Sequence, residues 1–324
     1  MYRVYINNED LTDYVGEVSW SDSLETLATE LSFKLATSRR DSNFKRVQDI
    51  TLGATFQLLG RDGVVVEGII VSEEVGELTT SFLVYDLAWY LNKSTVIKQF
   101  KKVTGKEAIE RLCEELGIPV EIEGLGTLID KIYKDKKVSD VIRDIIAQEE
   151  KHSKVNYYLA FEEGKLKIQP FKKVVVNGEF ELSQGNFIDV NSNVGEVSLS
   201  RSIKDLKNSI LVTSGDKEAI RVEGKAQDLA SIEKYGKLQE VITLEEEQFG
   251  KANIVANNEL KKLNRIAEDF NIKVLGDDKL KSGKVIELDI PLYRLKGDYL
   301  IKQSSHTVNG GIHTANLVLE AYYE

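Results

Sequence analysis

Hydrophobic and polar side chains alternate with a period of two over residues 27–36, and this pattern constrains the fold more than any other. One series consists of Leu27, Thr29, Leu31, Phe33 and Leu35, and the other consists of Ala28, Glu30, Ser32, Lys34 and Ala36. Because successive side chains of a β-strand point to opposite faces, the pattern predicts a strand that is buried on one face.

Further strand signals continue to about residue 95. Residues 55–59 and 64–71 flank Gly60-Arg61-Asp62-Gly63, and glycine and aspartate suit the positive φ angles of a tight turn, so a hairpin is predicted. Another strand is predicted over residues 79–85, after Gly76. Several strands joined by short turns favour a small β-barrel or sandwich over a parallel sheet.

Residues 96–195 predict a small α+β unit. Thr104 and Glu107 form a capping box at the start of a helix, which Gly117 and Pro119 should end. The helix carries hydrophobic residues at helical spacing, namely Ala108, Ile109, Leu112, Cys113 and Leu116. A second helix is predicted over 138–146, and a hairpin joins 157–161 to 166–171. Between the helices, we expect the hydrophobic side chains to pack beneath them; these are Leu128, Ile129 and Ile132.

The last third reads as strands with one long helix. Strands are predicted over 210–213, 285–290 and 299–303, with a C-terminal hairpin around residues 309–311. The helix should start near Thr243, capped together with Glu246. Its apolar stripe would consist of Ala252, Val255, Ala256, Leu260, Leu263, Ile266, Ala267 and Phe270. The fold class is therefore α+β and β-rich, with a strand-rich N-terminal domain (1–95), a middle α+β domain (96–195) and a strand-rich C-terminal domain with one long helix (196–324).

Composition excludes several classes of function. With 43 Lys and Arg against 53 Asp and Glu, the net charge of −10 argues against a nucleic-acid-binding surface, which needs clustered cations. No apolar run approaches the ~18 residues of a membrane span, and the N-terminus does not resemble a signal peptide. One cysteine excludes an intrachain disulfide and a four-cysteine metal site.

The pair His306 and His313 is the first candidate for site chemistry. If the hairpin turns on Asn309-Gly310, the two residues face each other within reach of one metal ion. If it turns on Gly310-Gly311, we expect the side chains to fall on opposite faces. No acidic residue lies between 303 and 319 to act as a third ligand, and His313 shares its face with mostly hydrophobic residues. We therefore expect structural histidines and no metal or cofactor.

Other candidates are weaker. Paired carboxylates could perform acid–base chemistry, and acidic runs occur at Glu73-Glu74, Glu149-Glu150, Glu162-Glu163 and Glu245-Glu246-Glu247. Each run lies at an expected turn or helix end, where acids are usually solvated. Cys113 lies on the apolar side of its helix, which favours a packed side chain over a nucleophile. Trp20 and Trp89 could line a sugar- or peptide-binding groove, but large aromatics in a β-rich protein more often pack in cores or interfaces. Gly124-Leu125-Gly126 lacks the third glycine of a dinucleotide-binding loop, and no other catalytic motif is present.

Short stretches along nearly the whole chain carry a family resemblance through their order and spacing. They are 18–21 with 29–35, 82–93, 108–119, 138–146, 157–168, 202–208, 235–239, 275–277, 297–301 and 305–313. Together they resemble the tail hub protein of PBSX-like prophages and related contractile tails, including phage-tail-like bacteriocins (tailocins). His306 and His313 match positions typical of that family, which has no catalytic task there.

The resemblance implies a non-enzymatic baseplate hub. Such hubs are homotrimers in which each subunit carries two related β-barrels, so that six barrels adapt a three-fold spike to a six-fold tail tube. The resemblance therefore implies two small β-barrel domains, 1–95 and 196–324, that flank the α+β domain 96–195. The implied partners are other copies of the chain, the tail tube protein, the central spike, and other baseplate and tape-measure proteins. The implied location is a virion or tailocin baseplate, assembled in the bacterial cytoplasm. The alternatives are a tail-associated cell-wall hydrolase or glycan-binding module, and a ligand-binding β-protein unrelated to tails.

Overall fold

The computed structural model describes residues 2–37, 50–181, 187–189, 192, 194–214, 221–244, 250–293 and 295–322. Contacts group the chain into two compact units. The first consists of Met1–Val197 and Asn271–Glu324, and the second of Ser198–Phe270. The second unit is therefore inserted between two stretches of the first.

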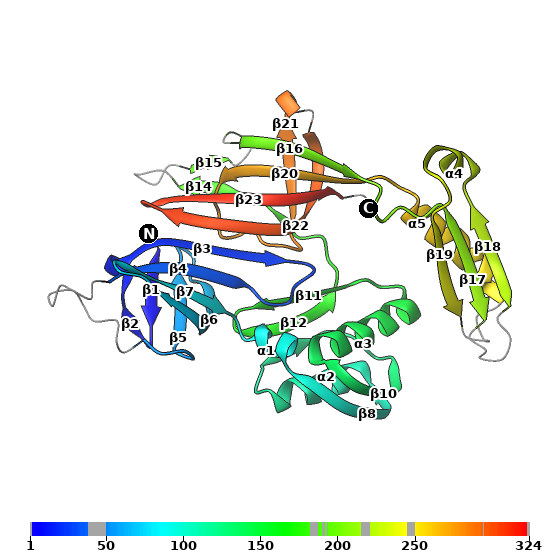
Figure 1. The fold of residues 1–324 in the computed structure, drawn as a ribbon, viewed down its shortest axis with the longest axis horizontal. Helices are drawn as coiled ribbons and strands as arrows, with labels where there is room; N and C mark the ends of the chain where they lie inside the picture. The colour runs from blue at the N-terminus through cyan, green and yellow to red at the C-terminus, as the bar shows by residue number, and fades with distance from the viewer. Residues whose placement is uncertain are drawn as a thin grey trace. The chain divides into compact units, whose positions relative to one another are not determined.

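The N-terminal part of the first unit is an antiparallel sheet, drawn in blue to cyan in Figure 1. Its elements are β1 (Arg3–Ile6), β2 (Glu9–Asp10), the 3-10 helix η1 (Thr12–Tyr14), β3 (Val15–Ser23), β4 (Glu30–Ala36), β5 (Thr55–Leu59), β6 (Val64–Val75) and β7 (Thr79–Tyr85). The predicted alternation is confirmed in β4, where Leu31, Phe33 and Leu35 are buried. The predicted hairpin is confirmed in β5 and β6.

The C-terminal strands of the first unit form a second group, part of which is drawn in orange to red in Figure 1. They are β13 (Val175–Val176), β14 (Glu179–Glu181), β15 (Phe187–Asp189), β16 (Val194–Ser202), β20 (Ala267–Leu275), β21 (Val285–Ile290), β22 (Leu295–Asn309) and β23 (Ile312–Ala321), with the 3-10 helix η5 (Pro291–Tyr293). The ends of β16 and β20 lie in the second unit. β22 and β23 form the predicted C-terminal hairpin.

One ladder joins the two groups. β22 pairs antiparallel with β3, with His306 opposite Trp20 and Ser304 opposite Asp22. The main path of the sheet therefore runs β16-β20-β23-β22-β3-β4-β7-β6-β5-β1-β2, and no ladder between described strands joins its two ends. The fold is β-rich as predicted, but two separately closed barrels are not confirmed.

The middle of the first unit mixes helices and short strands. It contains α1 (Ala88–Lys93), β8 (Thr95–Thr104), α2 (Gly105–Glu115), β9 (Val120–Ile122), β10 (Leu128–Lys137), α3 (Val138–Ser153), β11 (Tyr157–Glu162) and β12 (Lys165–Pro170). α2 begins as predicted, because the Thr104 hydroxyl accepts a hydrogen bond from the Glu107 amide. The Glu107 carboxylate does not complete a capping box in the described contacts and pairs instead with Arg111.

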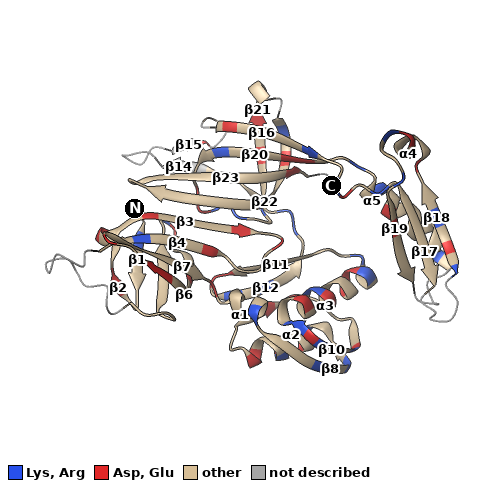
Figure 2. Ribbon diagram, viewed as in Figure 1, with Lys and Arg blue, Asp and Glu red and all other residues tan. Residues whose placement is uncertain are grey.

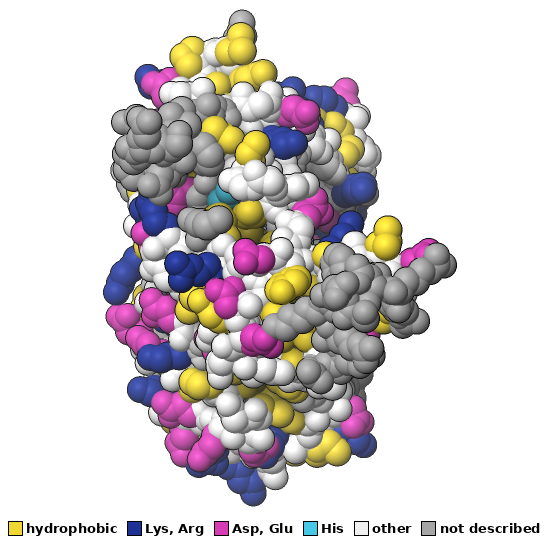
Figure 3. Space-filling model, turned by 90° about the vertical axis from the view of Figure 1, so that its left-hand side faces the viewer, with side chains coloured by type: hydrophobic (Ala, Val, Ile, Leu, Met, Phe, Trp, Pro, Cys, Tyr) yellow, Lys and Arg dark blue, Asp and Glu magenta, His cyan; other side chains and the backbone are white. Residues whose placement is uncertain are grey.

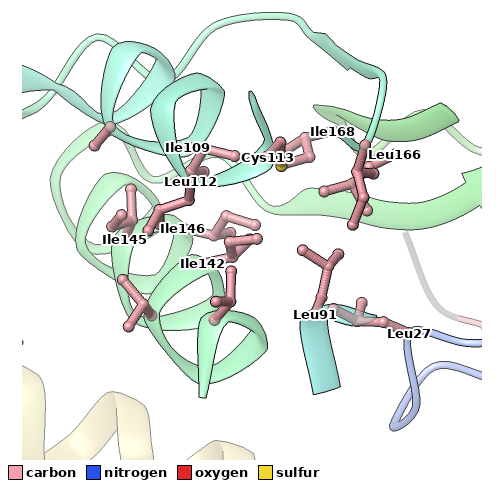
Figure 4. Close-up of a cluster of buried hydrophobic side chains, with 14 of the residues drawn as sticks. Leu27, Leu91, Ile109, Leu112, Cys113, Ile142, Ile145, Ile146, Leu166 and Ile168 are labelled. Atoms are coloured by element: carbon pink, nitrogen blue, oxygen red, sulfur yellow. The ribbon is translucent and has the colours of Figure 1, made fainter. Parts of the chain in front are cut away.

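The core of this middle part is built from hydrophobic side chains of α2, α3 and the neighbouring strands. Figure 4 shows Ile109, Leu112, Ile142 and Ile145 directed into one cluster with Leu166 and Ile168. The prediction for residues 128–132 was partly wrong. Only Ile129 is buried there, while Leu128 and Ile132 are exposed, because β10 is a strand whose alternate side chains point outward.

The two compact units do not coincide with the predicted boundaries after residues 95 and 195. The β3–β22 ladder is one reason, because it pairs a strand from the first predicted domain with a strand from the last. The division into domains 1–95, 96–195 and 196–324 stays a prediction.

The second unit is a three-stranded sheet with helices. It contains β17 (Ser209–Ser214), β18 (Val222–Gln227), α4 (Leu229–Tyr235), β19 (Gln239–Leu244) and α5 (Ala252–Leu263), with strand order β18-β17-β19. α5 packs on β17 and β18 through a small apolar core that includes Ile210, Val212 and Ala256.

The predicted helix start near Thr243 was wrong. Thr243 lies in β19, which pairs parallel with β17, so its backbone is held in a strand. α5 begins at Ala252 and ends at Leu263, and residues 267–270 belong to β20. Glu246, the other half of the predicted cap, lies outside the described residues, as do Glu245 and Glu247.

Candidate functional site

A group of polar and aromatic side chains gathers around the β3–β22 ladder, where the N-terminal and C-terminal groups of strands meet. We call this group the strand junction; it consists of Tyr2, Trp20, Asp22, Asp278, Ser304, His306 and His313. Sheet register explains the meeting, because His306 of β22 lies opposite Trp20 of β3. The β22–β23 hairpin then brings His313 beside them.

A chain of hydrogen bonds runs through the strand junction. The Tyr2 hydroxyl lies 2.7 Å from Asp278 Oδ1 and 2.7 Å from His313 Nδ1. His313 Nε2 lies 2.9 Å from His306 Nδ1, and His306 Nε2 lies 2.9 Å from the Leu280 carbonyl oxygen. A side branch connects the Ser304 hydroxyl, which lies 3.1 Å from His306 Nε2, to Asp22.

Trp20 and His306 are stacked in the strand junction, and both histidines are buried. The planes of Trp20 and His306 are 2° from parallel, with ring centres 4.8 Å apart. His306 is 1% exposed and His313 is 4% exposed. On the face that Figure 3 draws, histidine contributes only a small patch of the surface. Such burial makes each polar contact energetically important, because an unpaired buried polar group costs about 1–3 kcal/mol.

Burial also shifts the proton equilibria of these groups. It lowers the pKa of His306 to about 4 and the pKa of His313 to about 3, so that a positive charge on either ring is disfavoured. Burial raises the pKa of Asp278 and the pKa of Tyr2, because it disfavours a negative charge on either oxygen. The strand junction therefore favours uncharged side chains.

Gly276 makes room for this arrangement. A Cβ atom at this position would lie 2.2 Å from Cδ2 of the His313 ring, much closer than a real contact. The backbone is tied to the same residue, since the Gly276 amide donates to the His313 carbonyl oxygen at 2.8 Å. A glycine is therefore required for the imidazole to reach both Tyr2 and His306.

The prediction that a Gly310-Gly311 turn separates the two histidines was wrong. The hairpin does turn there, since Asn309 pairs with Ile312 and Val308 with His313. His306 and Val308 are two residues apart on one strand and so share a face, which makes the histidines diagonal neighbours on that face. Among the described residues, no three His, Cys, Asp or Glu side chains group as metal ligands. The expectation of packed, hydrogen-bonded histidines is confirmed.

Sequence reasoning missed Tyr2, Asp22 and Asp278. Asp278 precedes His306 by almost thirty residues, and Tyr2 lies at the opposite end of the chain. No spacing rule connects such positions before the β3–β22 register is known. The one available signal was Gly276 followed by two aspartates, which could have suggested a tight approach near acids.

A cleft of about 720 Å³ opens beside the strand junction in the first unit. Acidic groups line it, including Asp22, Asp86 and Glu162. Burial raises the pKa of Asp86 to about 7 and also raises the pKa of Asp22. Acids with raised pKa values are what general acid catalysis uses, so the cleft is the natural place to look for hydrolytic chemistry.

The contacts of these acids are structural. Asp86 accepts backbone hydrogen bonds at both oxygens, from Thr29 at 2.8 Å and from Ala88 at 3.0 Å. Asp22 Oδ1 accepts from the Ser282 amide at 2.8 Å and from the Ser304 hydroxyl at 2.9 Å. Glu162 pairs with Lys284 at 3.2 Å. Each carboxylate thus fastens one segment of the chain to another.

The remaining candidates are dispersed over the unit. Glu73 and Glu74 are exposed on β6, Glu163 pairs with Lys167, and Glu149 and Glu150 accept backbone hydrogen bonds from Thr127 and Tyr157. Cys113 is fully buried, and burial raises the pKa of its thiol to about 12, as suits a packed side chain.

The two tryptophans and the glycine pair also have structural contacts. Trp20 is buried in the strand junction, and Trp89 packs beside Tyr85 and Tyr90 at the edge of the middle core. The Gly124–Gly126 stretch is a loop whose Leu125 carbonyl accepts from the Lys106 amide near the start of α2.

A family model described as YQBQ-like matches residues 18–320. The chain belongs to the YQBQ-like family. No curated protein matches its sequence. None of the described helices is long and apolar enough to cross a membrane.

Solved structures of tail proteins share the fold of this YQBQ-like chain. A 43 kDa tail protein of prophage MuSo2 from Shewanella oneidensis superposes with a TM-score of 0.71 at 13% identity, over 98% of this chain and 97% of that one. A tail protein from Neisseria meningitidis MC58 gives 0.69 at 12% identity, over 99% and 96%. An E. coli type VI secretion system component, described as similar to T4 tail proteins gp27 and gp5, gives 0.53 at 10% identity, over 96% and 74%. At these identities the comparisons establish the fold.

Proposed function

We propose that this YQBQ-like protein is a non-enzymatic structural component of a phage or tailocin baseplate, and specifically its hub. The observation that carries the proposal is the end-to-end match to a prophage tail protein, which spans 98% of this chain and 97% of that one.

The hub proposal includes a homotrimer that joins a six-fold tail tube to a three-fold spike. Two β-rich groups in one chain suit this task, since three copies supply six of them. The N-terminal group has its own apolar core around Leu31, Phe33 and Phe56, as a separate barrel-like module requires. The C-terminal group would be the second module. Closed rings of identical subunits use different faces of neighbouring copies.

We propose that the middle α+β segment binds other baseplate proteins. Its β8–β10 ladder presents Ile97 and Ile132, which are 69% and 65% exposed. Lysines surround them on both strands, at positions 98, 101, 102, 131, 134, 136 and 137, and Figure 2 shows basic residues on these strands and on the adjacent helices. Exposed apolar side chains rimmed by charge are typical of protein-binding surfaces. The other proposed partners are the tail tube, the central spike and the tape-measure protein, in a baseplate assembled in the bacterial cytoplasm.

A test of the hub proposal is the mass of the purified full-length chain in solution. Mass photometry, alone and with the tube and spike proteins of the same tail, should detect a particle of about 110 kDa or complexes containing three copies of this 36.5 kDa chain. A chain that stays monomeric with both partners present would contradict the hub proposal.

The second candidate is a tail-associated cell-wall hydrolase or glycan-binding module, favoured by the acid-lined cleft. A hydrolase that uses Asp86 should clear a peptidoglycan suspension, and Asp86→Asn should abolish that clearing. Because the Asp86 oxygens are both bound by backbone amides, we expect no clearing by either protein.

A further inference from the structure

The strand junction contains one more hydrogen-bonded contact than a neutral tyrosine, two neutral histidines and an ionised aspartate have hydrogens to fill. Four contacts follow one another from Asp278 to Tyr2, to His313, to His306 and to the Leu280 carbonyl, at 2.7, 2.7, 2.9 and 2.9 Å. Each contact joins two atoms that are both able to accept, so each requires one hydrogen between them.

The row of hydrogen bonds ends at the Leu280 carbonyl oxygen, which can only accept, and this fixes the position of each hydrogen in the row. The Leu280 carbonyl has no hydrogen, so His306 Nε2 must donate to it. A neutral His306 then has a bare Nδ1, which must accept from His313 Nε2. A neutral His313 in turn has a bare Nδ1, which accepts the single hydrogen of the Tyr2 hydroxyl.

These three hydrogens leave the contact between Tyr2 and Asp278 unfilled. Two oxygen atoms 2.7 Å apart with no hydrogen between them would repel each other. Ser304 does not supply the missing hydrogen, because its hydroxyl lies beside His306, at the end of the row away from Asp278, and donates to Asp22. A fourth hydrogen is therefore needed, beyond those of a neutral tyrosine, two neutral histidines and an ionised aspartate.

We propose that the strand junction is a proton-binding site, which holds one proton more than the same side chains carry at neutral pH in the unfolded chain. The count does not depend on which group carries the proton. On Asp278, the carboxylic acid donates to Tyr2. On either histidine, the hydrogens shift along the chain and Tyr2 donates to an ionised Asp278. All three arrangements fill four contacts with four hydrogens.

The surrounding charges favour this proton. The charged groups that act on the strand junction are Asp62, Asp277, Arg61 and Lys281. These are two carboxylates and two cations, so an ionised Asp278 would add an uncompensated negative charge. Burial raises the pKa of Asp278, which places the proton preferentially on its carboxyl group. A cavity of about 500 Å³ reaches Tyr2, Asp278 and His313, and gives the proton a path to solvent.

A substitution can supply the missing hydrogen covalently. In Asp278→Asn, the side-chain amide can donate to Tyr2 and fill the contact without a bound proton. The wild-type fold must take up one proton as it forms above the pKa of an unfolded aspartate, about 3.9, whereas the variant fold takes up none at this position. The free energy of unfolding of the wild type, relative to that of Asp278→Asn, is therefore highest at low pH and falls as the pH rises.

The test is equilibrium unfolding of the full-length wild type and Asp278→Asn from pH 5 to pH 7, with Asp130→Asn as an exposed control. The unfolding constant of the wild type divided by that of Asp278→Asn should rise about tenfold per pH unit, about a hundredfold over the range. The unfolding constant of the wild type divided by that of Asp130→Asn should stay constant over the same pH range. A ratio to Asp278→Asn that changes less than about twofold would overturn the proposal, because the wild-type fold would then hold no proton beyond those that the unfolded chain carries.

A second measurement on the wild type keeps the proposal testable if Asp278→Asn does not fold. Neutron diffraction near neutral pH should locate four deuterons along the four contacts, including one on each side of the Tyr2 oxygen. Three deuterons, with one of the Tyr2 contacts empty, would overturn the proposal.

Discussion

The middle core and the strand junction hold the first unit together by different chemistry. Around Ile109 and Ile142, the core is built from hydrophobic side chains that contribute through contact area and shape. The strand junction buries His306 and His313 in a chain where each group depends on a hydrogen from the next. The core should therefore respond to changes of volume at every pH, and the strand junction to changes of hydrogen number and of pH.

The largest expected effect lies in the core. Ile142→Ala removes a fully buried side chain from α3 and leaves a cavity, which should lower the free energy of unfolding by about 2–5 kcal/mol. Chemical denaturation should give the same loss at pH 6 and at pH 8. Ile132→Ala is the matched control, because that isoleucine is exposed, and its effect should stay within about 0.5 kcal/mol.

A smaller effect is expected from overpacking the strand junction. Gly276→Ala places a methyl group 2.2 Å from the His313 ring, so the ring must move and its contacts with Tyr2 and His306 must weaken. We expect a loss of about 1–3 kcal/mol in denaturation experiments, together with changed fluorescence of the adjacent Trp20. Gly126→Ala is the control, since nothing lies within 4 Å of its added methyl group. Equal losses in the two variants would contradict the close packing at Gly276.

The smallest effect concerns the start of helix α2. Thr104→Ala removes the hydroxyl that accepts from the Glu107 amide and should cost about 1 kcal/mol of unfolding free energy. Thr104→Ser keeps the hydroxyl and should restore most of the loss. If serine and alanine have equal effects, the cap contributes nothing and α2 is held by packing alone.

The same contrast explains what the sequence could predict. Helix α2 and the β5–β6 hairpin follow from local signals, a cap at Thr104 and a turn at Gly60–Gly63, because the interacting residues are near neighbours in the chain. The β3–β22 ladder does not, since it pairs Trp20 with His306 and no periodicity links them. The error at Thr243 has the same origin, because parallel pairing with β17 outweighed a local capping signal.

The histidine pair was predictable only in part. Hydrophobic neighbours of His313 on β23 indicated a packed role, and the rings are indeed buried. Their partners were not predictable, because Tyr2 and Asp278 reach the site only through the complete sheet.

The proposed role of this YQBQ-like chain is that of a structural part of a tail baseplate. Its most direct test is immunoelectron microscopy of tail particles from the bacterium that encodes it, with an antibody against this chain and quantitative mass spectrometry of the same particles. We expect label at one end of each tail and three copies per particle. Label along the tail, or particles that lack the protein, would contradict it.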